Sequence, residues 1–432
     1  MAALIVFGIF VVLLIIGTPI GISLATAAMG AILNFDLGTA MISRNFEANI
    51  AKFPLVAIPF FILAGVLMEK AKIVDGISKF VILVVGRATG GLAIAAVITC
   101  IFWGAISGSG PATAAALGLV FIPTMIKQGY DKYFSASAIA AGAGLSIIIP
   151  PSIAFIVYGN LTDVSVGALF LGGIIPGVIV GGFLILSVYL SSKRHNFRGE
   201  MQRGSLKEIG KAFIGAFWSL LAPVIILGSI YAGIATPTES AIMGVFYALF
   251  VGLFVYKTIT FKLLISALSD TVVASATVML VVAMAGIFSW AASTLGVIDA
   301  AANLVSSLTT NKLVFLLLIN VVMLISGMFL DAISITYVFM PIILPVLLKL
   351  QIDPLFFGVV MVVALAIGQI TPPVAVNLYV TANIIKSNIT NEMVKYVLPM
   401  VIVSILALLV ITLFPQLTLW LPISSGLYTP RF

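Results

Sequence analysis

Long apolar stretches separated by short polar interruptions run through the whole chain. Residues 1–17, 312–327 and 397–414 are almost continuously apolar and, with their flanks, are long enough to cross a bilayer core about 30 Å thick. Runs of this length predict membrane-spanning helices rather than the amphipathic helices of a soluble core. The pattern therefore predicts an all-α polytopic membrane protein.

Two interruptions fall where a helix tolerates them poorly. Residues 106–111, ISGSGP, hold glycines and a proline, which cost a helix interior about 1 and 3 kcal/mol each. Pro150 and Pro151 lack a backbone N–H and disfavour a helical residue before them. We predict a re-entrant helical hairpin at about 104–126 and a broken helix at about 134–160. Each hairpin arm would have about ten to twelve residues, roughly 15–18 Å, enough to reach the bilayer middle but not to cross it.

The second half of the chain repeats this arrangement. At a spacing of 222 residues, identical residues recur at Pro123 and Pro345, Lys127 and Lys349, Asp131 and Asp353, Phe134 and Phe356, and Pro150-Pro151 and Pro372-Pro373. Ser107-Gly108 matches Ser326-Gly327 at a spacing of 219, after a three-residue gap. We therefore predict a second hairpin at about 324–348 and a second broken helix at about 356–384.

These matches divide the chain into two repeats. Residues 1–190 form the first, with scaffold helices at 1–85, and residues 213–432 form the second. Repeats with interrupted hydrophobic segments in corresponding places are typical of secondary transporters. We predict that the two repeats are inverted relative to each other across the membrane.

Charged residues are scarce and unevenly placed, which strengthens the membrane assignment. They make up 8% of the chain, whereas hydrophobic residues make up 62%; soluble proteins typically have roughly 25% and 45–50%. The densest basic segment, 191–212, separates the repeats, and the positive-inside rule predicts that it is a cytoplasmic linker. Lys257 and Lys262 follow two predicted spans later, on the same side. Because the net charge of +7 lies mainly in such loops, it does not indicate a nucleic-acid partner.

The composition also excludes most enzyme chemistry. The chain has one cysteine, Cys100, and one histidine, His195, which lies in the basic loop. The single cysteine excludes an internal disulfide and a thiolate metal site. No Ser/His/Asp triad, HExxH, CxxC or P-loop motif is found, and a histidine in a basic loop does not indicate a catalytic residue. The N-terminus lacks the basic segment of a signal peptide, so residues 1–17 are predicted to be a first span.

The interruptions supply oxygen ligands of the kind that suits Na⁺. In the first half the hydroxyls belong to Ser107, Ser109, Thr113, Ser146 and Ser152, beside carbonyls freed at residues 149–152. The second half offers Gly327, Asp331, Ser334, Thr336, Gly368, Thr371 and Asn377. Half-helix N-termini carry partial positive charge that suits a carboxylate. For any one of these residues, close helix packing is the alternative interpretation.

Asp331 is the most informative single residue in this set. A carboxylate within a membrane segment costs a few kcal/mol or more, so a functional role is the default hypothesis. The alternative is a charge at a water-filled vestibule or one paired with a distant lysine. We group Asp331 with Thr113, Ser334 and Asn377 as predicted substrate-binding residues.

Several longer motifs resemble the large membrane subunit of tripartite ATP-independent periplasmic (TRAP) transporters. They are LIVFGIFVVLLIIGTPIGISLA (4–25), FWGAISGSGPATAAALG (102–118), IIIPPSIAFIVYG (147–159), ALFLGGIIPG (168–177), GIATPTESAIMG (233–244) and GQITPPVAVNLYV (368–380). The resemblance extends over essentially the whole chain. It implies an elevator-type ion-transporter architecture in a bacterial inner membrane, and Na⁺-coupled import of an organic acid of the sialic acid or C4-dicarboxylate type.

The resemblance also implies partners and a ligand set. A soluble periplasmic binding protein would deliver the acidic substrate, and a small four-helix membrane subunit, expected as a separate polypeptide, would complete the scaffold. Na⁺ would be the only metal, with no transition metal. The implied sodium ligands are Ser107, Gly108, Ser109, Ser146, Ile149, Pro150 and Ser152 for one site, and Gly327, Gly368, Thr371 and Val374 for the other.

Two other functions remain open on the sequence. A single-component Na⁺-coupled carboxylate or anion transporter of the wider ion-transporter superfamily would share the hairpins and repeats but need no binding protein. A channel or an intramembrane enzyme is the alternative from another class, although the chain has no TVGYG-like filter and no nucleophile beside its histidine.

Overall fold

The computed structural model describes residues 2–73, 75–197 and 205–432, and within these residues the regular secondary structure is entirely helical. Eight of the described helical segments are long and apolar enough to cross a membrane. They are Phe53–Lys70 (η1 and α4), Gly110–Lys127 (α7), Val166–Arg194 (α10), Leu206–Tyr231 (α11), Pro237–Val255 (α12 and η3), Phe261–Thr294 (α13), Ala332–Lys349 (α16) and Asn391–Leu413 (α19). The predicted all-α polytopic class is confirmed.

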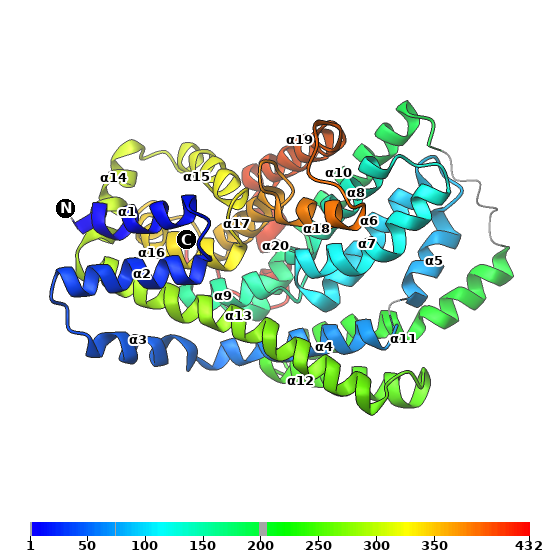
Figure 1. Cartoon of the computed structure of the whole chain (residues 1–432), viewed down its shortest axis with the longest axis horizontal. Coiled ribbons are helices and arrows are strands. Elements are labelled where there is room, and N and C mark those ends of the chain that lie inside the picture. Colours follow the sequence, from blue (N-terminus) through cyan, green and yellow to red (C-terminus); the bar gives the residue numbers. More distant parts are fainter. Residues whose placement is uncertain (1, 74, 198–204) are drawn as a thin grey trace.

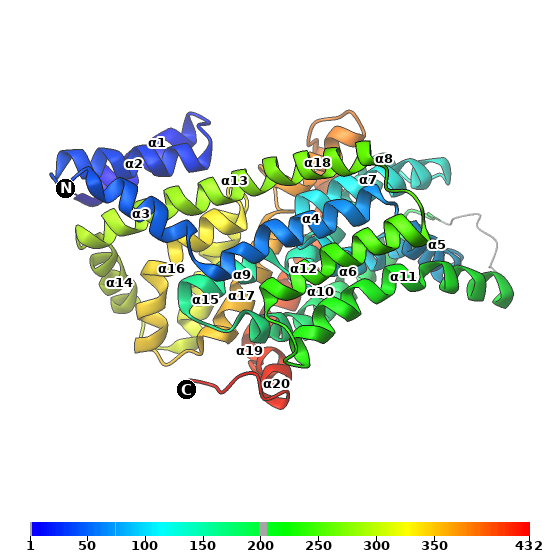
Figure 2. The same cartoon turned by 90° about the horizontal axis from the view of Figure 1, so that it is seen from below.

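The long helices α4, α11, α12 and α13 form a layer along one side of the molecule (Figure 2). Side-chain caps fix where these helices begin. Ser205 with Glu208 and Thr236 with Glu239 form capping boxes at the starts of α11 and α12, and the Thr260 hydroxyl accepts from the Leu263 N–H at the start of α13. The short helices α1 (Ala2–Ile15), α2 (Ile20–Asn34) and α3 (Ala40–Ile50) lie at one end, where α2 and α3 pack on α13.

The repeat predicted from the sequence is present in the helices. Hairpin one consists of α6 (Gly91–Ser107) and α7, and hairpin two of α15 (Lys312–Gly327) and α16. The first broken helix comprises α8 (Lys132–Gly144), η2 (Leu145–Ile147) and α9 (Ile153–Thr162). The second comprises α17 (Pro354–Gly368) and α18 (Val376–Ile384). Both proline pairs, Pro150-Pro151 and Pro372-Pro373, have cis peptide bonds.

Matching caps show that the correspondence is structural. Asp131 caps α8 and Asp353 caps α17, each accepting hydrogen bonds from the N–H groups two and three residues later. Ser109 caps α7 and Asp331 caps α16, each accepting from the N–H three residues later. The three-residue gap in the repeat therefore lies in the hairpin turns, upstream of these caps.

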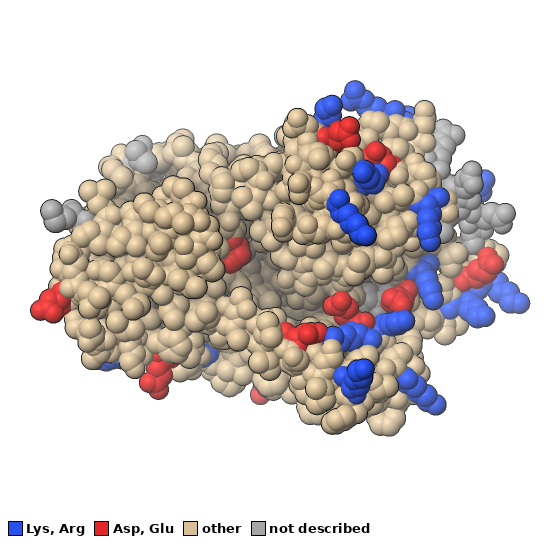
Figure 3. All heavy atoms as spheres, viewed as in Figure 1, with Lys and Arg blue, Asp and Glu red and all other residues tan. Residues whose placement is uncertain are grey.

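The two hairpins enter the molecule from opposite ends (Figure 1). Hairpin one opens at what we call the basic end, where lysine and arginine side chains gather (Figure 3). Lys127 ends α7 there, and Lys193 and Arg194 end α10. Hairpin two opens at the far end, where Lys312 donates to the Gln351 carbonyl oxygen. The repeats are thus inverted, and the described ends of the linker, at Arg194 and Leu206, lie at the same end of the molecule as Lys257 and Lys262, as the spacing of spans predicted.

Some sequence-based lengths need correction. The hairpin arms have 17 and 18 residues in hairpin one and 16 and 18 in hairpin two, so arms of ten to twelve residues were too short. The first arms reach further upstream, to Gly91 and Lys312, because the apolar runs before the turns fold as part of the hairpins. The run at 312–327 accordingly ends inside the protein, at the buried Gly327.

The ends of the first repeat also differ from expectation. The run at 1–17 forms a helix of 14 residues, about 21 Å long, which is short for a span. Gly17, with φ +86°, and Pro19 turn the chain into α2. The linker is helical at both ends, because α10 continues to Arg194 and α11 begins at Leu206; residues 198–204 of the linker lie outside the described residues.

Candidate functional site

The tip of hairpin one is a tight two-residue turn. Gly108, with φ +60°, follows the last residue of α6, and Ser109 caps the first residue of α7. The Thr113 hydroxyl lies 2.9 Å from the Ser107 hydroxyl and 2.8 Å from the Ser109 carbonyl oxygen, to which it donates. The Ser109 N–H approaches the Ser107 hydroxyl at 3.4 Å. The predicted residues Ser107, Ser109 and Thr113 therefore form one small cluster of oxygens.

Break one lies directly behind this tip and is fully enclosed. A Cβ placed on Gly108 would come within 2.6 Å of the Pro151 carbonyl oxygen, so the tip and the break are in backbone contact. The carbonyl oxygens of Ile149, Pro150 and Pro151 accept no hydrogen bond from any described residue, whereas the Ser152 hydroxyl donates to the Ile147 carbonyl at 2.6 Å. Such freed carbonyls are available to a cation.

Ser146 lies one helical turn before the break. A Cβ on Gly104 of α6 would lie 2.7 Å from the Ser146 Cα, so η2 packs closely against α6. The Ser146 hydroxyl lies 3.5 Å from the Cys100 carbonyl oxygen and has no closer partner among the described residues. Ser146 therefore belongs to the same region as Ser107.

The second tip and break are joined by backbone contacts of their own. Gly327 and Gly368 approach so closely that a Cβ on Gly368 would lie 2.6 Å from the Gly327 Cα. The Ala375 N–H donates to the Met328 carbonyl at 3.1 Å, and the Thr371 hydroxyl donates to the Ile367 carbonyl at 2.6 Å. Val374 lies in this break and is 43% exposed. The four residues of the predicted second sodium set are thus in one neighbourhood.

Asp331 and Ser334 are linked at the start of α16. One carboxylate oxygen of Asp331 accepts from the Ser334 N–H and the other from the Ser334 hydroxyl, both at 2.8 Å. Thr336, one turn on, donates to the Ala332 carbonyl at 2.6 Å. Capping of α16 explains the placement of the Asp331 side chain. Each carboxylate oxygen can still accept a further hydrogen bond.

Parts of both hairpins and both broken helices line one cavity of about 240 Å³. Its wall comprises Gly108, Ser109, Gly110, Pro111, Ile147, Ile153, Ala154, Asp331, Ala332, Ile333, Gln369 and Val376, together with Thr277, Val278 and Val281 of α13. Of the predicted site residues, Gly108, Ser109 and Asp331 reach the cavity, and the remaining ones lie around it. None of the lining residues is lysine, arginine or histidine.

Gln369 is a polar wall residue that sequence reasoning missed. It is 4% exposed, and its Oε1 atom has no hydrogen-bond partner among the described residues. Asn377 is fully buried, and neither its Oδ1 nor its Nδ2 atom has a partner. A Cβ on Gly110 would lie within 2.9 Å of the amides of both residues. A sequence signal was available, because Gln369 is a polar residue that directly follows Gly368 at the end of the apolar segment 354–368.

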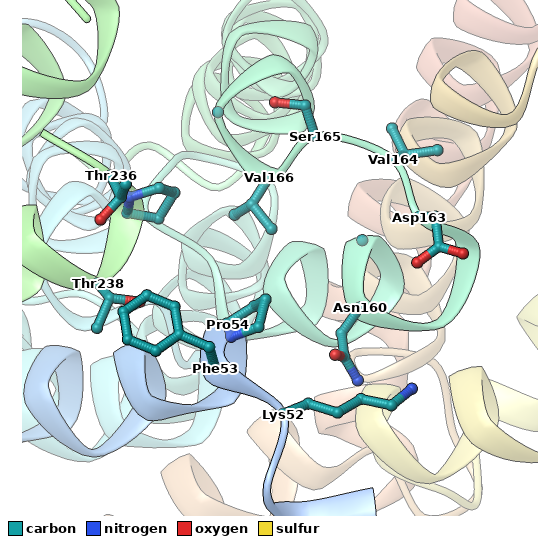
Figure 4. A pocket seen from close by; sticks show the side chains of 13 residues that line it. Lys52, Phe53, Pro54, Asn160, Asp163, Val164, Ser165, Val166, Thr236 and Thr238 are labelled. Atoms are coloured by element: carbon teal, nitrogen blue, oxygen red, sulfur yellow. The ribbon is translucent and has the colours of Figure 1, made fainter.

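A second cavity, of about 620 Å³, lies at the far end between α9, α10, α12 and η1. Figure 4 shows Lys52, Asn160 and Asp163 on one side of it and Phe53, Thr236 and Thr238 on the other. It contains none of the predicted site residues. The central cavity is therefore the one in which the repeat motifs meet.

Comparison with known proteins agrees with this architecture. Residues 7–417 match the family model described as "Tripartite ATP-independent periplasmic transporter, DctM component". The chain belongs to this TRAP transporter family. It is also similar in fold to the YdaH transporter of Alcanivorax borkumensis, with a TM-score of 0.62 over 91% of this chain and 89% of that one, at 16% sequence identity.

Curated relatives of this DctM-family chain are TRAP transporter large permeases. The C4-dicarboxylate large permease DctM of Rhodobacter capsulatus is 34% identical over 99% of this chain and 100% of its own length. The sialic acid large permease SiaM of Vibrio cholerae is 35% identical over 95% and 96%. The isethionate permease DctMQ of Oleidesulfovibrio alaskensis is 40% identical over 96% of this chain, which spans 66% of that longer protein.

Proposed function

We propose that this TRAP large permease imports an organic acid, driven by a Na⁺ gradient. The observation that carries the proposal is the convergence of two hairpin tips and two helix breaks on one cavity, with freed backbone carbonyls behind it. Unwound carbonyls suit a cation, and half-helix N-termini suit an anion. The family membership and the printed substrates of the relatives support an organic acid.

Two sodium ions would bind as cargo, one behind each tip. The first would use the hydroxyls of Ser107, Ser109, Ser146 and Ser152 and the carbonyls of Gly108, Ile149 and Pro150. The second would use mainly carbonyls of Gly327, Gly368, Thr371 and Val374. No cationic side chain in the cavity wall is available to offset the negative charge of the acid, so the bound sodium ions would offset it. Binding of the acid would then depend on binding of sodium.

Movement would occur by an elevator mechanism. The layer of α4, α11, α12 and α13 would stay with the scaffold, while the hairpins and broken helices would move as a body. The cavity lies between the two groups, because its wall combines both hairpins with Thr277, Val278 and Val281 of α13. Sliding along α13 would therefore expose the cavity to either side.

The same proposal includes the orientation of the chain in the membrane and its partner proteins. It would lie in a bacterial inner membrane with its basic end in the cytoplasm, as the positive-inside rule requires. A periplasmic binding protein would then deliver substrate at the far end, near the cavity of Lys52, and a small four-helix membrane subunit would complete the scaffold.

Uptake into proteoliposomes tests the proposal. With this chain, its small membrane partner and the binding protein present, replacing external Na⁺ by K⁺ is expected to abolish accumulation of the acid. Unchanged uptake in K⁺ would reject sodium coupling. Full uptake without the binding protein would instead favour the single-component alternative.

A further inference from the structure

A third cavity, of about 580 Å³, lies at the basic end, where the last turn of α10 meets the starts of α8 and α19. Its wall contains two basic side chains, Arg194 and Lys395, and two acidic ones, Asp131 and Glu392. None of the four forms an ion pair with a described residue. The positive-inside rule accounts for lysine and arginine at this end, but it does not account for carboxylates in the same wall. The cavity thus offers charged groups of both signs to a ligand.

Asp131 has a spare carboxylate oxygen. Its Oδ1 atom accepts from two N–H groups at the start of α8, and no described residue donates to its Oδ2 atom. At the equivalent position of the second repeat, the Asp353 Oδ2 atom accepts from the Tyr428 hydroxyl at 2.9 Å and from the Arg431 N–H at 3.1 Å. A donor on a ligand would therefore fill at Asp131 the place that the chain itself fills at Asp353.

Apolar side chains of α19 continue the cavity wall toward the middle of the membrane. Three wall residues share the helix face of Lys395, because they follow it by three, four and seven residues. They are Leu398, Pro399 and Ile402. Ile402 lies about 10 Å further along the helix than Lys395. Leu398 and Ile402 are 49% and 50% exposed, so this row is accessible at the surface.

The neighbouring helix α10 is arranged in the same way. Leu190 and Leu186 precede Arg194 by four and eight residues, on one helix face, and are 53% and 51% exposed. The helices α10 and α19 pack against each other, and both are long enough to cross the membrane. Each helix therefore has a cationic side chain at its end and exposed apolar side chains below it. A phospholipid has the same order, with a charged headgroup at the membrane surface and acyl chains beneath it.

We propose that this cavity binds a phospholipid whose headgroup carries a phosphate and a primary ammonium group, as in phosphatidylethanolamine. Arg194 and Lys395 would bind the phosphate, as basic pockets between membrane helices do. The ammonium group has three N–H donors, and Asp131 and Glu392 would accept from it. The acyl chains would lie along the exposed apolar rows of α10 and α19.

The acidic side chains of the wall decide between headgroups. A choline headgroup has no N–H, so it would leave the spare Asp131 oxygen without a donor. A glycerol headgroup would bring a net negative charge to a wall in which two carboxylates already balance two cations. The ethanolamine headgroup matches the wall in both signs of charge.

Native mass spectrometry of the full chain in detergent tests the proposal, with three phospholipids that have the same acyl chains and differ in headgroup. Phosphatidylethanolamine is expected to bind at least about ten-fold more tightly than phosphatidylcholine or phosphatidylglycerol. Glycerophosphoethanolamine, which is the same headgroup without acyl chains, is expected not to compete at equal concentration, because it lacks the apolar contacts.

Variants separate the two halves of the headgroup site. Asp131→Asn keeps a capping residue but removes the charge, so phosphatidylethanolamine should bind about five-fold more weakly while phosphatidylcholine is unchanged. Asp353→Asn is the matched control and should change neither affinity, because the chain itself occupies the second oxygen there. Lys395→Gln should weaken all three phospholipids about five-fold. Lys127→Gln, at an exposed lysine of the same end that lies outside the cavity wall, should weaken none.

Equal or tighter binding of phosphatidylglycerol would overturn the inference, because it would show a general attraction of the basic end for anionic lipid. Equal binding of phosphatidylcholine, displacement by glycerophosphoethanolamine, or equal effects of Lys127→Gln and Lys395→Gln would overturn it as well. None of these measurements depends on sodium coupling or on the transported acid, so the function proposed above is tested separately.

Discussion

The two helix breaks carry the same proline pair, but their surroundings differ. Around Pro150-Pro151 every residue from Ile147 to Ser152 is buried. Around Pro372-Pro373 the chain reaches the surface, and Val374 is 43% exposed. The same local sequence signal therefore produces an enclosed site in one repeat and an accessible one in the other.

Neighbouring elements explain the difference. The tip in front of break one is a turn of two residues, and α10 covers the other side, where a Cβ on Gly173 would lie 2.5 Å from the Ile148 carbonyl oxygen. The tip in front of break two has four residues between α15 and α16, of which Phe329 is 52% exposed. A tight turn under a covering helix leaves little room to move, whereas a longer turn at the surface leaves more.

The largest effect is expected at Gly108 in the enclosed tip. Gly108→Ala places a methyl group 2.6 Å from the Pro151 carbonyl at φ +60°, so Na⁺-driven uptake should fall at least about 100-fold. Gly129→Ala is the control, because Gly129 also has positive φ, +81°, but nothing lies within 4 Å of its Cβ position. Loss of membrane insertion or partner assembly in Gly108→Ala would show a packing role instead.

A smaller effect is expected in the accessible repeat. Gly368→Ala brings a methyl group 2.6 Å from the Gly327 Cα, but the four-residue turn can shift, so uptake should fall about ten-fold. Gly228→Ala, in α11 with open space at its Cβ position, should retain uptake. A loss as complete as that of Gly108→Ala would mean that the two tips are equally rigid.

The proposed sodium sites should also differ in their use of side chains. Ser107→Ala removes a hydroxyl from the first cluster and should raise the Na⁺ concentration for half-maximal uptake about five-fold. Thr371→Val should raise it less than about two-fold, because the Thr371 hydroxyl already donates to the Ile367 carbonyl. Sodium titration of uptake measures both, and equal shifts would contradict unequal ligation.

The smallest effect on transport is expected from cysteine substitutions at the open ends of the two hairpins. Labelling of these cysteines should leave transport intact and report only how the two hairpins are oriented in the membrane. Lys127 and Lys349 are exposed equivalents in the last turns of α7 and α16. The native Cys100 is buried, so Lys127→Cys and Lys349→Cys can be labelled in the native background. A membrane-impermeant maleimide should reach them from opposite faces, and labelling from the same face would contradict inversion.

The sequence predicts the elements that depend on local chemistry. The proline breaks and the hairpin tip at residues 106–111 could be placed from spacing and residue type. Asp131 and Asp353 could be matched as equivalent positions of the repeat, whereas their role as helix caps is seen only in the structure. The lengths of the hairpin arms could not be predicted from the sequence, because an apolar run such as 312–327 is compatible with a membrane span as well as with a hairpin arm. The close approach of Gln369 to Gly110 joins two positions that are 259 residues apart in the chain. Only the tertiary fold brings those two together.

The paired caps Ser109 and Asp331 have a consequence for energetics. If the two repeats were identical, the two-fold axis between them would make the inward-facing and outward-facing states of the proposed elevator equal in free energy. A neutral cap on α7 and an acidic cap on α16 remove that degeneracy. In the elevator mechanism proposed above, the inward-facing and outward-facing states of the unloaded carrier would therefore differ in free energy.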